Sequence, residues 1–185
     1  MGILVLNGSA RTEGSNTEVL THQVLEGLPY NEVVLREKRI LPINDLRHTD
    51  GGFVPVDDDY DEVIQQVLSH DTLIFVSPVY WYTVTGLMKN FIDRWSQSLR
   101  DKRFDFKAVM ASKTAYVLTA GGDNPKVKAL PMIQQLKYTF DFVGMPLEAY
   151  IIAKASKPGD IAKDTKALDE AKWLNAKLKE LSASE

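Results

Sequence analysis

The stretch ILVLNGSARTEGSNT, residues 3–17, decides the fold class of this 185-residue chain. It begins with four apolar residues and then turns to glycines, hydroxyls and one arginine, just before a segment with helical periodicity. A short run that is apolar on both faces is typical of a strand buried inside a parallel sheet. Followed by a polar turn and a helix, it predicts the first βα unit of an α/β domain.

Four more apolar runs follow, at residues 33–35, 73–76, 116–118 and 150–152. The segments between them carry apolar residues at intervals of three and four, as on one face of a helix, and these helices are expected near residues 16–27, 60–68, 87–99, 133–143 and 168–181. The alternation predicts one α/β domain over residues 1–185, with a five-stranded parallel sheet and helices on both faces. Residues 37–59 and 100–113 exceed what a connection requires, so we expect functional or mobile loops there.

Composition excludes several classes of protein. The chain has no cysteine, which rules out disulfides, thiolate metal sites, iron–sulfur clusters and a cysteine nucleophile. Its net charge is −3 and its basic residues are scattered, so we expect no nucleic-acid partner. No apolar run approaches the ~20 residues that span a membrane, and the first residues lack a signal-peptide pattern. We therefore expect a cytoplasmic protein without a membrane partner.

Ligands of an open parallel sheet bind beyond the carboxyl ends of the strands, so the loops that follow the strands are the candidate sites. The first loop leads into a helix, and its glycines, hydroxyls and arginine suit an anion such as phosphate. Its candidate residues are Ser9, Arg11, Ser15, Asn16 and Thr17. The alternative is that Ser15 or Asn16 only caps the helix.

The loops after the third and fourth strands suit a flat aromatic ligand. The third strand is followed by a proline and three consecutive aromatic residues, and the fourth by a glycine pair that lets the backbone approach a ligand. The candidates are Pro78, Val79, Tyr80, Trp81, Ala120, Gly121 and Gly122. Alternatively, the aromatic residues fill an oligomer contact or cap the core, and the glycines form a plain turn.

Other chemistry has less support in the sequence. The acidic run at residues 57–59 precedes a helix, where carboxylates stabilise the N-terminus, so we expect no metal there. His22, His48 and His70 share no metal-ligand spacing, and His22 and His70 are expected on helix surfaces. No side chain is identified as a catalytic acid or base.

Two of these loops carry a family resemblance. Residues 8–17, together with the motif SPVYWY at 77–82 and the helix GLMKNFIDR at 86–94, resemble NAD(P)H-dependent FMN reductases of flavodoxin-like fold. The sequence TAGG at 119–122 is similar to the family's third flavin loop. The resemblance spans about residues 3–153 and implies the strand order 2-1-3-4-5.

The resemblance also implies a cofactor and a reaction. Ser9, Arg11, Ser15, Asn16 and Thr17 would hold the phosphate of FMN. The residues that would line the dimethylbenzene and ribityl side of the flavin, with backbone amides near the ring, are Pro78, Val79, Tyr80 and Trp81, and those that would approach its pyrimidine edge are Ala120, Gly121 and Gly122. NAD(P)H would be the hydride donor. The acceptor would be a quinone, an azo or nitro compound, free flavin or a ferric chelate. Backbone amides near Gly121 and Gly122 are candidates for stabilising negative charge on the reduced ring.

Two alternatives stay open at this point: an electron-transfer flavoprotein without enzymatic activity, and a flavin-free binding module. The absence of cysteine excludes the iron–sulfur branch of related flavoproteins. Members of the family are typically dimers or tetramers, so we expect a homodimer or homotetramer. We also expect Trp95 near the subunit contact and residues 100–113 close to the flavin of another subunit.

Overall fold

The computed structural model describes residues 2–183 and contains one five-stranded sheet. The strands are β1 (Ile3–Asn7), β2 (Asn31–Val34), β3 (Thr72–Val76), β4 (Thr114–Gly121) and β5 (Leu147–Lys154). They lie in the order β2-β1-β3-β4-β5, and each neighbouring pair is parallel. The predicted parallel sheet and its strand order are therefore confirmed.

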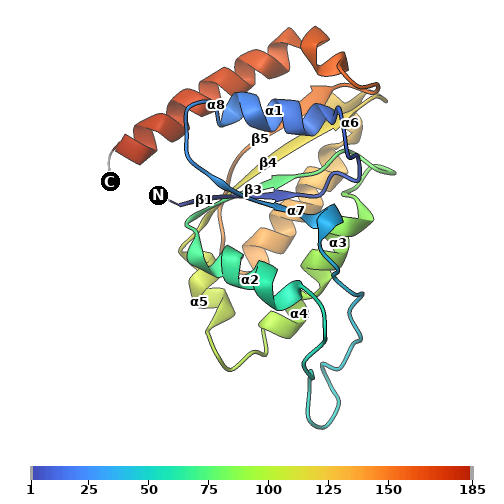
Figure 1. Ribbon diagram of the computed structural model, residues 1–185, viewed down its shortest axis with the longest axis vertical. Coiled ribbons are helices and arrows are strands. Elements are labelled where there is room, and N and C mark those ends of the chain that lie inside the picture. The colour runs from blue at the N-terminus through green and yellow to red at the C-terminus, as the bar shows by residue number, and fades with distance from the viewer. Residues whose placement is uncertain (1, 184–185) are drawn as a thin grey trace.

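Helices cover both faces of this sheet, as predicted (Figure 1). One face carries α1 (Asn16–Val24) and the long α8 (Thr165–Ala183). The other carries α2 (Tyr60–Ser69), α3 (Gly86–Asp93), α4 (Trp95–Ser98), α5 (Phe106–Ala111) and α7 (Leu130–Phe142). The short helix α6 (Pro125–Lys128) follows β4, and the 3-10 turns η1 (Leu35–Glu37) and η2 (Asp160–Lys163) follow β2 and β5.

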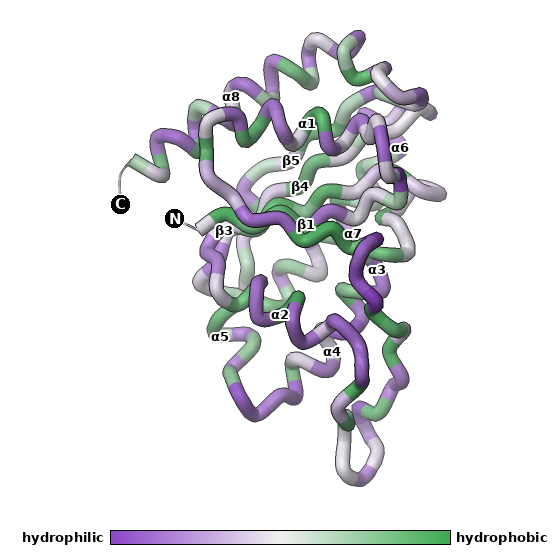
Figure 2. Tube along the Cα trace, in the orientation of Figure 1, coloured by the Kyte–Doolittle hydropathy of each residue, from purple (hydrophilic) through white to green (hydrophobic). Residues whose placement is uncertain are grey.

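Two separate cores result, because successive residues of a strand point to opposite faces. In β1, Ile3 and Val5 pack with α1 and α8, whereas Leu4 and Leu6 pack toward α2 and α3. Figure 2 shows the apolar strands between helices of mixed hydropathy. None of the helices within residues 2–183 is both long and apolar enough to cross a bilayer.

The helix expected over residues 87–99 is divided. α3 ends at Asp93 and α4 begins at Trp95, with Arg94 between them. Arg94 is buried and donates to the Asp58 carboxylate at 2.6 Å and to the Leu41 carbonyl oxygen at 3.0 Å. Its guanidinium also lies over the Tyr60 ring, 4.5 Å from the centroid. This buried ion pair ties the long 38–59 segment to the helical layer.

The environment of Asp58 keeps it ionised. Burial raises the pKa of the carboxyl, but bonds from Arg94 and from the backbone amides of Leu41 and Tyr60 outweigh it and leave the pKa below its usual value. The acidic run at 57–59 thus contributes an internal ion pair.

Trp95 does not lie at the surface, contrary to the expectation from the sequence. It is buried, and its ring contacts four phenylalanine rings at centroid distances of 5.7 to 6.4 Å: Phe75, Phe91, Phe106 and Phe140. Removing such a side chain costs about 3–5 kcal/mol of folding stability. A substitution at Trp95 would therefore report on folding and not on assembly.

Two further expectations were wrong. Residues 100–113 are not all loop, because they include α5. His70 is not a surface residue of a helix. It is buried just after α2, and its ring nitrogens contact the Gln66 carbonyl oxygen at 2.7 Å and the Asn31 amide at 2.9 Å.

Candidate functional site

The three predicted loops meet at the carboxyl ends of β1, β3 and β4. All of the predicted site residues except Trp81 line one cavity of about 200 Å³ there. Ala155 and Ser156, from the loop after β5, complete its wall. The expectation that these loops converge is confirmed, while their role in binding stays a prediction.

The first loop presents a chain of buried hydroxyls. The Ser9 and Ser15 oxygens lie 3.1 Å apart, and the Ser15 and Thr17 oxygens 2.9 Å apart. All three side chains are buried, at exposed fractions of 5% or less. Buried polar groups are normally hydrogen-bonded. Here the three side-chain hydroxyls bond to one another, and the Ser9 hydroxyl also accepts a hydrogen bond from the Arg11 backbone amide at 3.3 Å. Because hydroxyls rotate, these groups can turn toward an anion in the cavity.

The start of α1 adds further donors. Ser15 occupies the N-cap position, but its side chain does not cap the helix, contrary to the alternative drawn from the sequence. The first amides of a helix have no partner within the helix, and they carry partial positive charge. Arg11 is exposed on the cavity wall, and its guanidinium pairs with no carboxylate among residues 2–183. The loop therefore offers hydroxyls, amides and one free cation to the same space.

Asn16 has a different task from its neighbours. Its side-chain amide donates to the Lys157 carbonyl oxygen at 2.9 Å and accepts from the Ile161 amide at 3.3 Å. Asn16 thereby fastens the loop after β5 to the beginning of α1.

Thr85 connects the first and second loops. Its hydroxyl caps α3 by accepting from the Met88 amide at 3.3 Å, and it donates to the Gly8 carbonyl oxygen at 2.6 Å. A Cβ atom at Gly8 would lie 3.0 Å from the Met88 Cβ and 3.2 Å from the Thr85 hydroxyl oxygen, so a larger residue there would push the two loops apart.

The second loop ends in a strained two-residue turn. Tyr80 and Thr83 exchange both backbone hydrogen bonds, at 2.9 and 3.0 Å. The two residues between them, Trp81 and Tyr82, have φ of 48° and 64°. Positive φ at both central residues is typical of a type I′ turn, which favours asparagine and glycine. Two aromatic residues are costly there, and Trp81 is 92% exposed.

Polar contacts hold this turn against the rest of the site. The Tyr82 hydroxyl donates to Asp123 at 2.9 Å, and Lys128 donates to the same carboxylate oxygen at 2.6 Å. Thr83 donates to Gln135 on α7. The Lys128 bond, followed by the Tyr82 bond, lowers the pKa of Asp123. Trp81 and Tyr82 line a second cavity of about 510 Å³, which shares residues Val79, Gly121, Gly122 and Ser156 with the first.

The glycine pair after β4 allows close packing of loops. A Cβ atom at Gly122 would lie 2.8 Å from Ser156, and one at Gly121 would lie 3.2 Å from Val79. The sequence reading missed Ala155 and Ser156. Both follow the fifth strand, so the rule applied to the other strand ends would have found them.

These features fit FMN. A phosphomonoester matches the hydroxyls, helix amides and Arg11 of the first loop, and a flat ring matches the aromatic turn and the side-chain-free glycine backbone. The two adjoining cavities offer separate spaces for the polar and the flat part of such a ligand.

Comparisons with known proteins agree with this geometry. Residues 1–157 match the family model described as NADPH-dependent FMN reductase. The chain is 49% identical over 175 residues to the Bacillus subtilis protein named "Putative NAD(P)H-dependent FMN-containing oxidoreductase YwqN", covering 94% of this chain and 96% of that protein. It is 26% identical over 170 residues to FMN-dependent NADH:quinone oxidoreductase 1 of Hahella chejuensis, covering 82% and 83%.

Solved structures give the same result. The structure titled Trp repressor binding protein from Bacillus subtilis has a TM-score of 0.78 and 41% identity, covering 93% of this chain and 96% of that one. An FMN-dependent NADH-azoreductase from Bacillus anthracis has a TM-score of 0.69 at 15% identity, covering 96% and 99%, and shows the shared fold. The chain belongs to the NADPH-dependent FMN reductase family, and it is a flavodoxin-like oxidoreductase that uses FMN and NAD(P)H.

Proposed function

We propose that this protein transfers a hydride from NAD(P)H to bound FMN and then reduces a flat aromatic acceptor, with quinones first among the candidates. The observation that carries the proposal is the pair of adjoining cavities. One is lined by buried hydroxyls, and the other by an exposed aromatic turn.

The residues divide the work of holding the cofactor. Ser9, Ser15, Thr17 and Arg11 bind the phosphate of FMN, while Asn16 fixes the loop that closes the cavity. Pro78, Val79, Tyr80 and Trp81 would line the dimethylbenzene and ribityl side of the flavin, and Ala120, Gly121 and Gly122 would approach its pyrimidine edge. The backbone amides of Gly121 and Gly122 would be the donors nearest to that edge and would stabilise negative charge there.

Bound FMN would supply the redox chemistry by carrying two electrons from one substrate to the other. In the overall reaction, the nicotinamide C4–H bond breaks and NAD(P)⁺ leaves. A quinone takes up the two electrons and two protons, one of which comes from water, and leaves as the hydroquinone. The protein orients both substrates and excludes water, and no side chain is assigned as an acid or a base.

The aromatic turn favours flat acceptors. Trp81 and Tyr82 form a wall of the second cavity, and rings stacked against such a wall gain about 0.5–1.5 kcal/mol beyond simple burial. Azo dyes, nitroaromatic compounds and free flavin share this flatness and are secondary candidates. Ferric chelates, which are not flat, are the weakest candidate.

Anaerobic stopped-flow absorbance tests the proposal in two steps. NADPH should bleach the flavin absorbance quickly, and the reduced protein should then be reoxidised by a quinone faster than by a ferric chelate. Reoxidation at equal rates by every acceptor would contradict the proposed acceptor class. Heating should release FMN, identified by mass, and release of FAD would contradict the cofactor fit.

We also propose a cytoplasmic homodimer or homotetramer built from one domain per chain, with residues 100–113 near the flavin of another subunit. Exposed aromatic residues on α7, one of which contacts the 100–113 segment, support an interface on this side of the molecule. Tyr138 and Phe142 on α7 are 65% and 62% exposed, and the Lys107 ammonium of α5 lies 4.1 Å from the Phe142 ring centroid. Light scattering should give a molar mass that is a multiple of the 20.8 kDa of one chain, and Phe142→Glu should lower this mass. A monomeric wild-type protein would contradict this proposal.

A further inference from the structure

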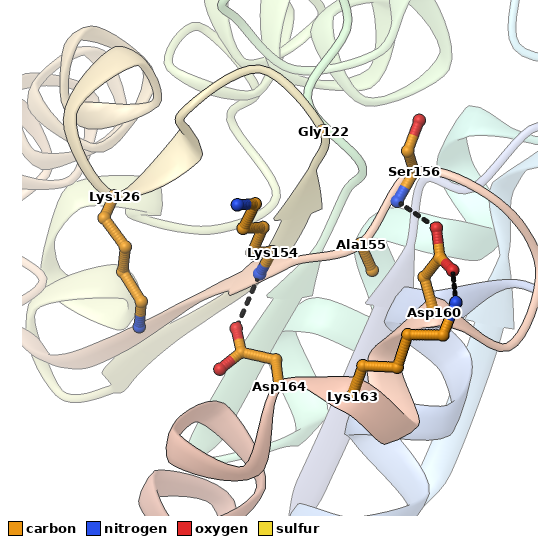
Figure 3. Close-up of a pocket in the computed structure, with 8 residues that line it drawn as sticks. All are labelled: Gly122, Lys126, Lys154, Ala155, Ser156, Asp160, Lys163 and Asp164. Atoms are coloured by element: carbon orange, nitrogen blue, oxygen red, sulfur yellow. Dashed lines mark hydrogen bonds and ion pairs between the residues drawn. The ribbon is translucent and has the colours of Figure 1, made fainter.

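A third cavity, of about 500 Å³, lies beside the end of β5 (Figure 3). It shares Gly122, Ala155 and Ser156 with the cavity at the first loop, residues 8–17, which we call the phosphate loop. It shares Gly122 and Ser156 with the cavity at the turn of residues 80–83, which we call the aromatic turn. All three cavities therefore adjoin at the same two loops. We call this third cavity the lysine pocket.

Three lysines from three different elements surround the lysine pocket. They are Lys126 on α6, Lys154 at the end of β5 and Lys163 at the end of η2. The ammonium group of Lys154 has no hydrogen bond or ion pair with any residue in the range 2–183, and Figure 3 shows its side chain beside the cavity without a dashed contact at its end. A free cation on a cavity wall is a ready partner for an anion.

The two carboxylates of the lysine pocket, Asp160 and Asp164, accept hydrogen bonds from backbone amides. Asp164 accepts from the Lys154 amide at 2.7 Å and from the Ala167 amide at 3.1 Å, at the start of α8. Asp160 accepts from the amides of Ser156 and Lys157 at 3.3 and 2.8 Å and from the ammonium group of Lys163 at 2.7 Å. These bonds shape the loop after β5, and they neutralise Lys163 but not Lys154.

Lys126 is available as a second contact. It pairs with Glu170 at 3.2 Å, and both side chains are partly exposed to solvent. Such surface pairs contribute at most about 1 kcal/mol, so a dianionic phosphate can replace this partner. Lys128, on the same helix, is already bound to Asp123 and faces the aromatic turn.

We propose that the lysine pocket binds the 2′-phosphate that distinguishes NADPH from NADH, with Lys154 as its principal contact and Lys126 as the second. The inference rests on the proposed function, because the nicotinamide must lie at the flavin in the adjoining cavities. The 2′-phosphate lies at the opposite end of the dinucleotide from the nicotinamide, so it needs a cationic site beside the flavin site and separate from it. The enzyme therefore prefers NADPH.

Steady-state kinetics with Lys154→Gln and both dinucleotides tests this proposal. Loss of one charge-assisted bond to phosphate should raise KM for NADPH about tenfold. The values of kcat, KM for NADH and FMN affinity should not change. Lys172→Gln is the matched control, since it removes the same charge from an exposed lysine of α8 that pairs with Asp169. It should alter none of these quantities.

Competition identifies the phosphate that is recognised. Adenosine 2′-monophosphate should inhibit wild-type protein competitively against NADPH, and about tenfold more weakly in Lys154→Gln. Adenosine 5′-monophosphate and inorganic phosphate at the same concentrations should inhibit less. If inorganic phosphate inhibited as strongly as adenosine 2′-monophosphate, the lysine pocket would recognise phosphate in general, and the proposal that it recognises the nucleotide would be wrong.

Two outcomes would overturn the proposal while leaving the proposed function intact. Equal changes in KM for NADPH and NADH would assign the lysines to the diphosphate that both dinucleotides share. If neither KM changed, the lysine pocket would have no part in binding the dinucleotides. If wild-type protein bound FMN but neither dinucleotide reduced it, the proposed function itself would fail.

Discussion

The phosphate loop and the aromatic turn face the same site but are built in opposite ways. In the phosphate loop, Ser9, Ser15 and Thr17 are buried, and their hydroxyls are held together by hydrogen bonds. In the turn, Trp81 is almost fully exposed and sits in a backbone conformation that costs of order 1–3 kcal/mol. The polar side chains of one loop are buried, and the other loop presents a ring to solvent.

On the proposed function, this difference corresponds to two kinds of binding. A cofactor that stays bound benefits from buried donors that lose little freedom on binding. Substrates that arrive and leave in turn need an accessible surface that many flat molecules can touch. Substitutions in the phosphate loop should therefore change retention of FMN, whereas substitutions of the exposed ring at Trp81 should change turnover, and those that tolerate positive φ should also increase stability.

The largest effect is expected for Arg11→Ala. Loss of a charge-assisted bond to phosphate, worth about 1.5–3 kcal/mol, should weaken FMN binding about tenfold to a hundredfold. Fluorescence quenching of FMN measures this affinity. The control is Arg47→Ala, which removes an exposed arginine paired with Asp45 in a distant loop. Unchanged affinity in Arg11→Ala would show that the exposed guanidinium does not reach the phosphate.

A smaller effect is expected for Ser15→Ala. The substitution removes the central hydroxyl of the buried chain and leaves Ser9 and Thr17 without their shared partner. FMN affinity should fall about threefold to tenfold, and the free energy of unfolding should fall by about 1 kcal/mol. Chemical denaturation of flavin-free and FMN-loaded protein separates the two losses. A loss of stability alone, with affinity unchanged, would contradict a phosphate-binding role.

Trp81→Asn should have opposite effects on stability and turnover. Asparagine tolerates positive φ, so the free energy of unfolding should rise by about 1 kcal/mol, which raises Tm by about 2–4 °C in a chain of this length. KM for a quinone should increase several-fold because a stacking ring is lost. Trp173→Asn, at an exposed tryptophan of α8, should not alter quinone turnover. A Trp81→Asn variant that is less stable would show that the ring packs in solution.

The smallest effect concerns Tyr82 and pH. The lowered pKa of Asp123 means that its bonds stabilise the fold at pH values above the ordinary aspartate pKa of about 3.9, and this contribution is lost as pH falls through the lower folded value. Wild-type protein and Tyr82→Phe should therefore differ in Tm from pH 8 to about 5, and the two Tm values should begin to converge as pH falls below about 4. A Tm difference that persists in acid would show that the Tyr82 hydroxyl stabilises the fold independently of the charge on Asp123.

Local patterns were sufficient for much of the fold and the site. The apolar runs predicted all five strands, and the rule that ligands bind at strand ends selected the residues that line one cavity. Patterns failed where a side chain is polar but buried, as in Arg94, or where an apolar stripe is shared by two helices, as at Trp95. In both cases the deciding contact comes from a distant part of the chain, Asp58 or Phe140.

The sequence by itself determined the parallel sheet, its two helical layers and the three loops, because buried strands and amphipathic helices have periods that can be read locally. Only the tertiary structure decided that Ser15 leaves α1 uncapped, that Trp81 is exposed in a strained turn, and that Ser156 and Lys154 adjoin the site. Each of these depends on how loops approach across the sheet edge. That approach is set by packing between segments far apart in the chain, which no local pattern records.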